Sequence, residues 1–244
     1  MADSDGQREV CAGGFRVPVS PSQVGAIIPC HNEAHRLGDV IRGLLGVVLR
    51  VLVVDDGSSD SSDSIARAAG AEVRRNPTRR GKGAALATGW SAAATYGWEW
   101  VLFLDGDGQH CPEDAQKFLE AAGGEIRLVI GNRMDQVDAM PWLRAATNRA
   151  LSRRVSQLAG QPLPDSQCGF RLVHLPTLLG LHLSSQQFEI ESEMCVAFAR
   201  AGCGIRFVPI QVRYGSERSK IRPIADAWRW WRWYQRTRKE IEAA

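Results

Sequence analysis

The chain has 244 residues, of which 44% are hydrophobic and 23% are charged, and its formal net charge is +3. This length and composition fit a globular protein with a substantial core and exclude a disordered chain, and the small net charge gives no sign of a nucleic-acid partner. The six cysteines are scattered without a Cys-x-x-Cys pair, and no apolar run reaches about 18 residues, so neither a disulfide framework, a zinc site nor a membrane-spanning helix is expected.

The first half of the chain alternates strand and helix patterns. Residues 1–20 are rich in Gly, Ser and Asp and are expected to form a flexible tail. Apolar runs then predict strands over 24–28, 51–54, 72–74 and 101–104, and helical spacing predicts helices over 37–45, 60–69 and 84–94. We expect Asp60 to cap the second of these helices. The alternation predicts a parallel sheet built from right-handed crossovers.

The second half continues this α/β pattern. Helices are expected over 112–122, 141–158 and 188–198, and strands over 128–130 and 205–212. The helix over 141–158 is basic, and Pro209 favours an edge position for the last strand, because proline cannot donate a backbone hydrogen bond to a neighbour.

The most informative stretch directly follows the predicted strand at 101–104. Asp105, Asp107 and Gln109 present two carboxylates and an amide oxygen at alternate positions from the carboxyl end of that strand. Ligands bind at this edge of an open α/β sheet. Hard oxygen donors suit Mg²⁺ or Mn²⁺ with positions left open for substrate phosphates.

Other common phosphate and metal motifs do not fit. An EF-hand beginning at Asp105 would need glycine and glutamate where the chain has His110 and Gln116. A P-loop around the later Gly-Lys pair would need glycine at Asn76 and serine or threonine at Gly83. No Gly-x-Gly-x-x-Gly follows the first strand, so a dinucleotide site is not indicated.

Seven motifs in order make the chain resemble family 2 glycosyltransferases with the GT-A fold, in the branch of dolichol-phosphate mannosyl- and glucosyltransferases and their bacterial polyprenyl-phosphate relatives. The motifs are IIPCHNE (27–33), VVDDGSSD (53–60), RGKGAAL (80–86), LDGDGQH (104–110), DSQCGFRL (165–172), FEIESEM (188–194) and RYGSERSK (213–220). The resemblance implies a Rossmann-like, mostly parallel sheet flanked by helices, with a catalytic domain over residues 21–221.

The resemblance also implies roles for individual residues. The nucleotide-sugar would be bound by Pro29, Asn32, Glu33, Asp56, Lys82 and Asp105. Mg²⁺ or Mn²⁺ would be held by Asp105, Asp107 and Gln109. The acceptor phosphate would meet Arg133, Arg144, Asn148 (where relatives often carry serine), and Arg213, Ser219 and Lys220 of a basic loop. The residues expected to act in catalysis are Asp107, Arg133, Arg144 and Asp165.

The implied reaction is a metal-dependent, inverting transfer of a hexose from a UDP- or GDP-sugar to a polyprenyl or dolichyl phosphate. A phosphate acceptor is already ionised and needs cations rather than a strong base. If the acceptor were instead a hydroxyl group of a glycan, a carboxylate base would be needed, and Asp165, Glu189 and Glu191 are the candidates. A catalytically silent nucleotide-sugar-binding protein and a nucleotidyltransferase are the remaining alternatives.

Residues 222–244 carry four tryptophans and several arginines. On a helical projection Ile224, Trp228, Trp230, Trp231 and Tyr234 share one face, the arginines gather on another, and Trp233 fits neither. This pattern is typical of a helix in a membrane interface, and equally of one that docks on the catalytic domain or a second subunit. Together with the lipid acceptor, it leads us to expect a cytoplasmic protein, peripheral on the inner face of the membrane.

Overall fold

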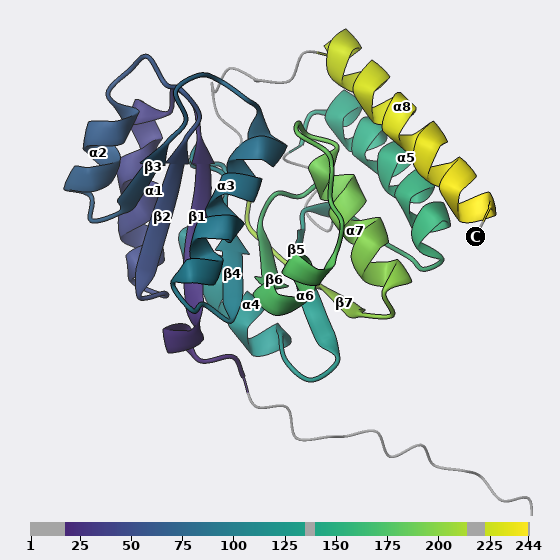
Figure 1. Cartoon of the computed structure of the whole chain (residues 1–244), viewed down its shortest axis with the longest axis horizontal. Helices are drawn as coiled ribbons and strands as arrows, with labels where there is room; N and C mark the ends of the chain where they lie inside the picture. The colour runs from purple at the N-terminus through teal and green to yellow at the C-terminus, as the bar shows by residue number, and fades with distance from the viewer. Residues whose placement is uncertain (1–17, 135–139, 214–222, 244) are drawn as a thin grey trace, which may run out of the picture.

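The computed structural model describes residues 18–134, 140–213 and 223–243, and a seven-stranded sheet forms its centre (Figure 1). The strands are β1 (Val24–Cys30), β2 (Arg50–Asp55), β3 (Glu72–Arg75), β4 (Trp100–Phe103), β5 (Ile126–Asn132), β6 (Arg171–His174) and β7 (Gly204–Pro209), in the order β3-β2-β1-β4-β6-β5-β7. All neighbours pair in parallel except β6, which is antiparallel to β4 and β5. The expected mostly parallel sheet is therefore confirmed, and reversed β6 begins at the carboxyl edge of the other strands.

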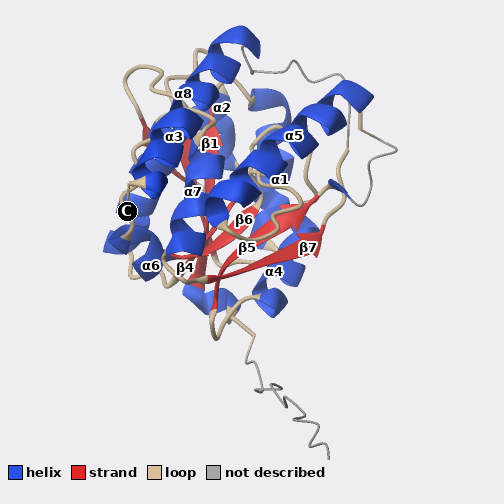
Figure 2. Cartoon of the chain, turned by 90° about the vertical axis from the view of Figure 1, so that its right-hand side faces the viewer, coloured by secondary structure: helices blue, strands red, loops and turns tan. Residues whose placement is uncertain are grey.

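Helices cover both faces of the sheet (Figure 2). They are α1 (Ala34–Leu45), α2 (Ser62–Ala68), α3 (Lys82–Thr95), α4 (Ala115–Ala121), α5 (Trp142–Ala159), α6 (Leu175–Gly180), α7 (Ile190–Arg200) and α8 (Pro223–Glu242), with short 3-10 turns at Pro21–Gln23 and Pro112–Asp114. The chain moves outward from β1 to β3 through α1 and α2 and then returns to β4 through α3. Right-handed crossovers therefore place α3 on the opposite face from α1 and α2.

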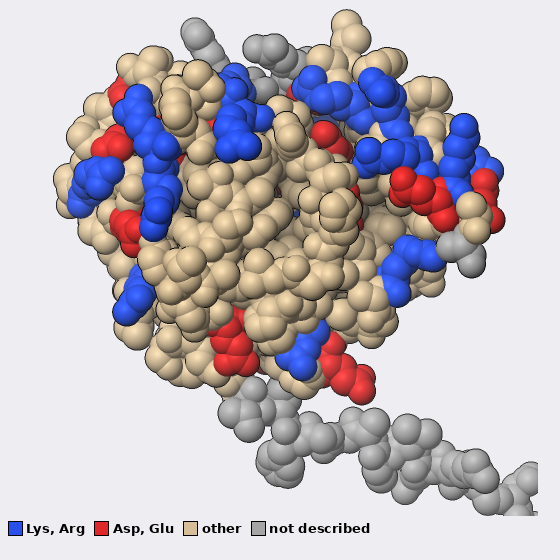
Figure 3. All heavy atoms as spheres, viewed as in Figure 1, with Lys and Arg blue, Asp and Glu red and all other residues tan. Residues whose placement is uncertain are grey.

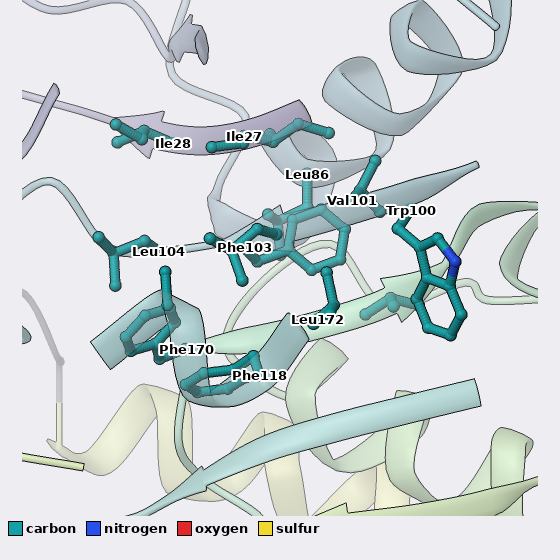
Figure 4. Packing of buried hydrophobic residues seen from close by; sticks show 14 of the residues in the cluster. Ile27, Ile28, Leu86, Trp100, Val101, Phe103, Leu104, Phe118, Phe170 and Leu172 are labelled. Atoms are coloured by element: carbon teal, nitrogen blue, oxygen red, sulfur yellow. The ribbon is translucent and has the colours of Figure 1, made fainter. Parts of the chain in front are cut away.

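One hydrophobic core cluster extends across the sheet, and Figure 4 shows its packing around β4. All four residues of β4 are buried, as expected for a strand covered on both faces. Phe118 of α4 stacks on Phe170 with ring centroids 4.2 Å apart, and the ring of His110 lies 5.7 Å from the same Phe170. The loop after β4 therefore rests on a rigid aromatic support.

Two helix starts differ from the sequence prediction. α3 begins at Lys82 rather than at residue 84, so Lys82 occupies the first helical position. Asp60 is not the N-cap of α2, because the helix begins one residue later and Ser61 precedes it. The Asp60 carboxylate accepts the backbone N–H groups of Ala34 (3.1 Å) and Ser62 (3.0 Å), and thereby ties the start of α1 to the start of α2.

The last strand also ends earlier than expected. β7 stops at Pro209, at the sheet edge that this proline predicts, and residues beyond it leave the sheet. Val212 then forms an isolated antiparallel bridge with His110. The chain is thereby directed from the edge strand to the loop that carries the candidate metal ligands.

Candidate active site

The loops after β1 and β2 form one hydrogen-bonded unit. Asn32, whose φ of 54° is the only positive value of a non-glycine residue in the described chain, accepts the backbone N–H of Ser59 at 2.8 Å. Its own N–H donates to Ser58 Oγ at 2.9 Å, and the N–H of Glu33 donates to Ser62 Oγ at 2.9 Å. Asparagine tolerates this left-handed conformation better than most residues. These hydrogen bonds hold together the IIPCHNE and VVDDGSSD motifs, which the family resemblance assigns to nucleoside binding.

Asp56 organises the loop that leads to α3. Its two carboxylate oxygens accept the Asn76 side-chain amide (2.9 Å), the Arg80 N–H (2.9 and 3.0 Å) and the Gly81 N–H (2.7 Å). These four contacts match the roughly four acceptor positions of a carboxylate. Asp56 is buried, whereas Pro29, in β1 beside it, is partly exposed.

Lys82 lies between two carboxylates at the carboxyl edge of the sheet. Its Nζ is 2.6 Å from Asp105 Oδ1 and 2.6 Å from Glu191 Oε1. Burial disfavours the ammonium, but the two carboxylates outweigh burial and raise the pKa of Lys82. Burial likewise opposes ionisation of Asp105, and Lys82 outweighs it and lowers the pKa of Asp105. Both groups are therefore charged at neutral pH.

Glycine at position 169 makes room for this ion pair. A Cβ atom at Gly169 would lie 2.6 Å from Asp105 Oδ2 and 2.8 Å from Lys82 Nζ, closer than real Cβ contacts. The DSQCGFRL motif therefore packs its backbone directly against the pair. Glu191 was expected only as a candidate base, and its pairing with Lys82 was not predicted. The available signal was an acidic residue beside the apolar face of α7, where a buried carboxylate needs a cation.

The LDGDGQH motif meets two distant basic segments. Asp107 Oδ1 accepts the N–H of Gln109 at 2.9 Å, and Gln109 Oε1 accepts Nη2 of Arg144 at 3.3 Å. The backbone oxygen of Gln109 accepts the N–H of Arg213 at 2.8 Å, and the Arg213 side chain is exposed. Ser219 and Lys220, assigned to the same basic loop, lie outside the described residues.

Arg133 and Asp165 form a buried ion pair. Nε and Nη2 of Arg133 each lie 2.7 Å from a different oxygen of Asp165, and the Arg133 N–H donates to the same carboxylate at 3.1 Å. Burial alone would raise the pKa of Asp165, but Arg133 outweighs burial and lowers it. Asn148, four residues after Arg144, is buried in α5 with its amide 4.0 Å from the Met140 sulfur.

Arg171 connects two motifs that the sequence analysis treated separately. Its fully buried guanidinium donates to the backbone oxygens of Cys168 (2.7 Å), Glu191 (2.6 Å) and Ser166 (2.7 Å). The residue thereby holds the 165–170 segment against the first turn of α7. The signal in the sequence was an arginine followed at once by the apolar residues of β6.

Two other polar residues in the motif loops have perturbed acidities. Burial raises the pKa of the Cys168 thiol to about 12, so a thiolate nucleophile is not available there at neutral pH. Burial, aided by the charge of Arg133, lowers the pKa of His110 to about 4, so this histidine is neutral. Both side chains are therefore uncharged at neutral pH.

Comparison with known proteins identifies the family of the chain. The model of the family described as "Glycosyl transferase family 2" matches residues 26–176. Glycosyltransferase AglJ of Haloferax volcanii is 33% identical over 193 residues, which cover 78% of this chain and 63% of AglJ. Undecaprenyl-phosphate mannosyltransferase of Micrococcus luteus is 31% identical over 201 residues, which cover 77% of this chain and 82% of that protein.

A solved structure shows the same fold. Glucosyl-3-phosphoglycerate synthase from Mycobacterium tuberculosis, in complex with Mn²⁺, uridine diphosphate and phosphoglyceric acid, matches with a TM-score of 0.67 at 22% identity. The match covers 89% of this chain and 78% of that chain. The resemblance drawn from the seven motifs is therefore confirmed: the chain belongs to glycosyl transferase family 2 and is a glycosyltransferase with the GT-A fold.

Proposed function

We propose that the enzyme transfers a hexose from a nucleoside diphosphate sugar to a polyprenyl phosphate, with inversion, at the inner face of the cytoplasmic membrane. The proposal takes glycosyl transfer from the family and adds the donor, the metal and the acceptor. The Micrococcus luteus relative is named for an undecaprenyl phosphate, and the solved neighbour holds uridine diphosphate and Mn²⁺. Either UDP or GDP fits the donor class proposed here.

The contact between Arg144 and Gln109 carries this proposal. It brings a cation from α5 to the end of the LDGDGQH motif, although 35 residues separate the two positions in the chain. An acceptor phosphate bound by Arg144 would approach the donor phosphates at that motif. Arginine is suited to this task because its guanidinium can contact two phosphate oxygens at once.

The state of the carboxylates supports a phosphate acceptor over a hydroxyl acceptor. Asp165 is held by Arg133, and Glu191 is held by Lys82. Because Arg133 lowers the pKa of Asp165, that carboxylate is a weak base, and the Glu191 carboxylate is already occupied by the Lys82 ammonium at 2.6 Å. A phosphate monoester needs no base, because it is already ionised at neutral pH. In this proposal Asp165 orients Arg133, and Arg133 with Arg144, Asn148, Arg213, Ser219 and Lys220 forms the acceptor side.

The donor side would use the two locked loops. Pro29, Asn32 and Glu33 would contact the nucleoside, and Asp56 would contribute by holding residues 76–81 in place. Lys82 and Asp105 would lie at the diphosphate, where the ammonium can stabilise charge that develops on the leaving group.

A divalent cation fits the residues present. Asp105, Asp107 and Gln109 offer hard oxygen donors, and Asp105 already has a cation, the Lys82 ammonium, at 2.6 Å. No group of three His, Cys, Asp or Glu side chains able to hold a metal occurs in the described part of the chain. Substrate phosphates and water would therefore complete the coordination. When bound, Mg²⁺ or Mn²⁺ would stabilise the negative charge of the leaving diphosphate.

Membrane association is part of the proposal. In the described ranges, none of the helices has the length and apolar character needed to span a bilayer. We assign catalysis to residues 21–221 and contact with the membrane surface to residues 222–244.

A transfer assay tests the proposed function. Purified protein with Mn²⁺ or Mg²⁺ would receive radiolabelled UDP- and GDP-sugars and a short polyprenyl phosphate in detergent, and label would be counted in the organic phase. We expect one donor to be used and the Asp107→Asn variant to lose at least about a hundredfold in rate. Label that remains aqueous with every donor, while nucleotide binding is intact, would contradict the lipid phosphate acceptor.

One observation favours a hydroxyl acceptor as the second candidate. Burial raises the pKa of Glu189, which is half-buried at the start of α7, and a carboxyl group of this kind can act as a base. Sugar transfer to a glycan that is lost in the Glu189→Gln variant would support that alternative. If the Glu189→Gln variant instead transfers sugar to polyprenyl phosphate at the wild-type rate, the lipid phosphate acceptor is supported.

A further inference from the structure

Exposed large hydrophobic side chains are concentrated on α5 and α8. Five of the eight such residues in the described chain belong to these two helices. They are Trp142 (80% exposed), Leu143 (62%), Ile224 (88%), Trp228 (55%) and Trp231 (53%). The other three are leucines at or after the ends of α1 and α6. We call the set of five the α5–α8 apolar surface.

The aromatic residues of α8 fall into two groups, one packed against the rest of the chain and one exposed. Trp233 and Tyr234 are buried in the core cluster, and the indole of Trp230 donates to Ser192 Oγ at 2.9 Å. The sequence analysis placed Trp230 and Tyr234 on one face with Trp228 and left Trp233 unassigned, and this division was wrong. The inner face docks on the catalytic domain, which leaves Trp228 with Ile224 and Trp231 on an outer stripe.

The α5–α8 apolar surface lies at the acceptor end of the molecule. Figure 1 shows α5 and α8 side by side, with both helices beginning at the same end. The guanidinium of Arg154 lies 5.6 Å from the ring centroid of Tyr234. Arg144 precedes Arg154 by the same number of residues as Ile224 precedes Tyr234. Because the rise per residue is constant in a helix, Ile224 lies near the level of Arg144 along the helix axes.

Basic residues flank the outer stripe. Arg229 and Arg236 are partly exposed, and each pairs with an acidic residue of α8, Asp226 and Glu240 respectively. The guanidinium of Arg232 lies 4.6 Å from the ring centroid of Trp228. Figure 3 shows Lys and Arg side chains over the α8 side of the molecule, with Asp and Glu side chains among them. Tryptophan beside arginine suits an interface with anionic lipid, where the ring enters the headgroup layer and the cation meets phosphate.

We propose that the α5–α8 apolar surface docks on an anionic lipid bilayer and presents the Arg144 end of the site to the headgroups. This inference deepens the proposed function, since the lipid acceptor would then arrive beside its binding residues. Both helices contribute, so the contact is wider than the single C-terminal helix that the sequence indicated. Docking itself requires no substrate and can be measured alone.

Vesicle co-sedimentation of the full chain tests the proposal. Vesicles would contain phosphatidylcholine and phosphatidylglycerol in equal parts, or phosphatidylcholine alone. We expect binding to the anionic vesicles, with a partition coefficient that falls at least about tenfold in Trp228→Ser/Trp231→Ser and in Trp142→Ser/Leu143→Ser. The matched control, Leu49→Ser/Leu179→Ser, removes exposed leucines elsewhere and should change the coefficient by less than about twofold.

The outcomes separate this inference from the proposed function. No vesicle binding by the wild-type chain, equal binding by all variants, or gel filtration of a dimer that only the α5 and α8 variants dissociate would overturn the docking surface. Transfer to polyprenyl phosphate in detergent should be unchanged in these variants, because no substituted residue is placed in the site. Vesicle binding without transfer to any lipid phosphate would contradict the proposed function and leave the docking surface standing.

Discussion

Two regions of the site, the loops after β1 and β2 and the 165–171 segment, are held in place in different ways. The loops after β1 and β2 are joined to each other by backbone groups and short polar side chains such as Asn32, Ser58 and Asp60. The 165–171 segment is held by buried charged side chains, since Arg133 pairs with Asp165 and Arg171 donates to the backbone of α7.

This difference has energetic consequences. A hydrogen bond between neutral groups contributes about 1 kcal/mol, and its loss is partly replaced by water at an exposed loop. A buried charge that loses its partner costs several kcal/mol, because no solvent compensates it. Substitutions that break the buried charged contacts of the 165–171 segment should therefore destabilise the fold more than substitutions in the loops after β1 and β2.

Arg171→Leu should show the largest effect. The substitution leaves the buried backbone oxygens of Cys168, Ser166 and Glu191 without their charged donor, and we expect a loss of about 4 kcal/mol in the free energy of unfolding. Urea denaturation followed by circular dichroism measures it. Arg74→Leu, at an exposed edge-strand position, is the control and should be close to wild type. Equal stability of the two variants would contradict the strong contribution of buried charged contacts to the 165–171 segment.

Asp165→Asn should cost about 3 kcal/mol at pH 7, because it leaves the Arg133 guanidinium buried without its counter-charge. The pKa of Asp165 is lowered in the folded state, so its contribution is present above the unfolded value near 4 and is lost as the pH falls through the folded pKa. The difference between wild type and variant should therefore shrink below about pH 4. Denaturation at a series of pH values measures this, with Asp39→Asn, in an exposed pair, as control. A difference that stays constant down to pH 2 would argue against the pairing.

Lys82→Met should separate metal binding from transfer. The substitution removes the ammonium that lies 2.6 Å from Asp105, so a divalent cation no longer competes with it for that carboxylate. We expect the affinity of the substrate-free protein for Mn²⁺ to rise about tenfold while sugar transfer falls. Calorimetric titration with Mn²⁺ measures the affinity, and Lys117→Met, which loses a half-exposed pair with Asp114, is the control. Weaker Mn²⁺ binding in Lys82→Met would show that Lys82 supports the metal site rather than competing with it.

Asp60→Ala should have the smallest effect of the four. It removes the acceptor of two backbone N–H groups at the starts of α1 and α2, which we expect to cost about 1 kcal/mol in the free energy of unfolding. Thermal unfolding measures it. Asp63→Ala, which breaks only an exposed pair with Arg67 on α2, should cost less. If Asp60→Ala lost as much free energy of unfolding as Asp165→Asn, the loops after β1 and β2 would not differ from the 165–171 segment in this respect.

The predicted strands were confirmed where an apolar run is followed by turn residues. The strands that lead into the IIPCHNE, VVDDGSSD and LDGDGQH motifs were placed to within a few residues, because short apolar runs ending in polar turns allow few other structures. Helix starts were less accurate, as Asp60 shows: its carboxylate caps a helix from a different part of the chain. α6 was not predicted at all, since its six residues are too few for a periodic pattern.

The sequence by itself determined the family, the mostly parallel sheet and the motif loops at its carboxyl edge, because these depend on local patterns and on motif order. Only the tertiary structure decided that Lys82 joins Asp105 to Glu191, that Arg133 is paired with Asp165, and that Trp233 is buried while Trp228 is exposed. Each of these depends on which residues distant in the chain share a low-dielectric interior, where an ion pair or a buried ring is stabilised by its neighbours. Sequence spacing carries no information about those neighbours.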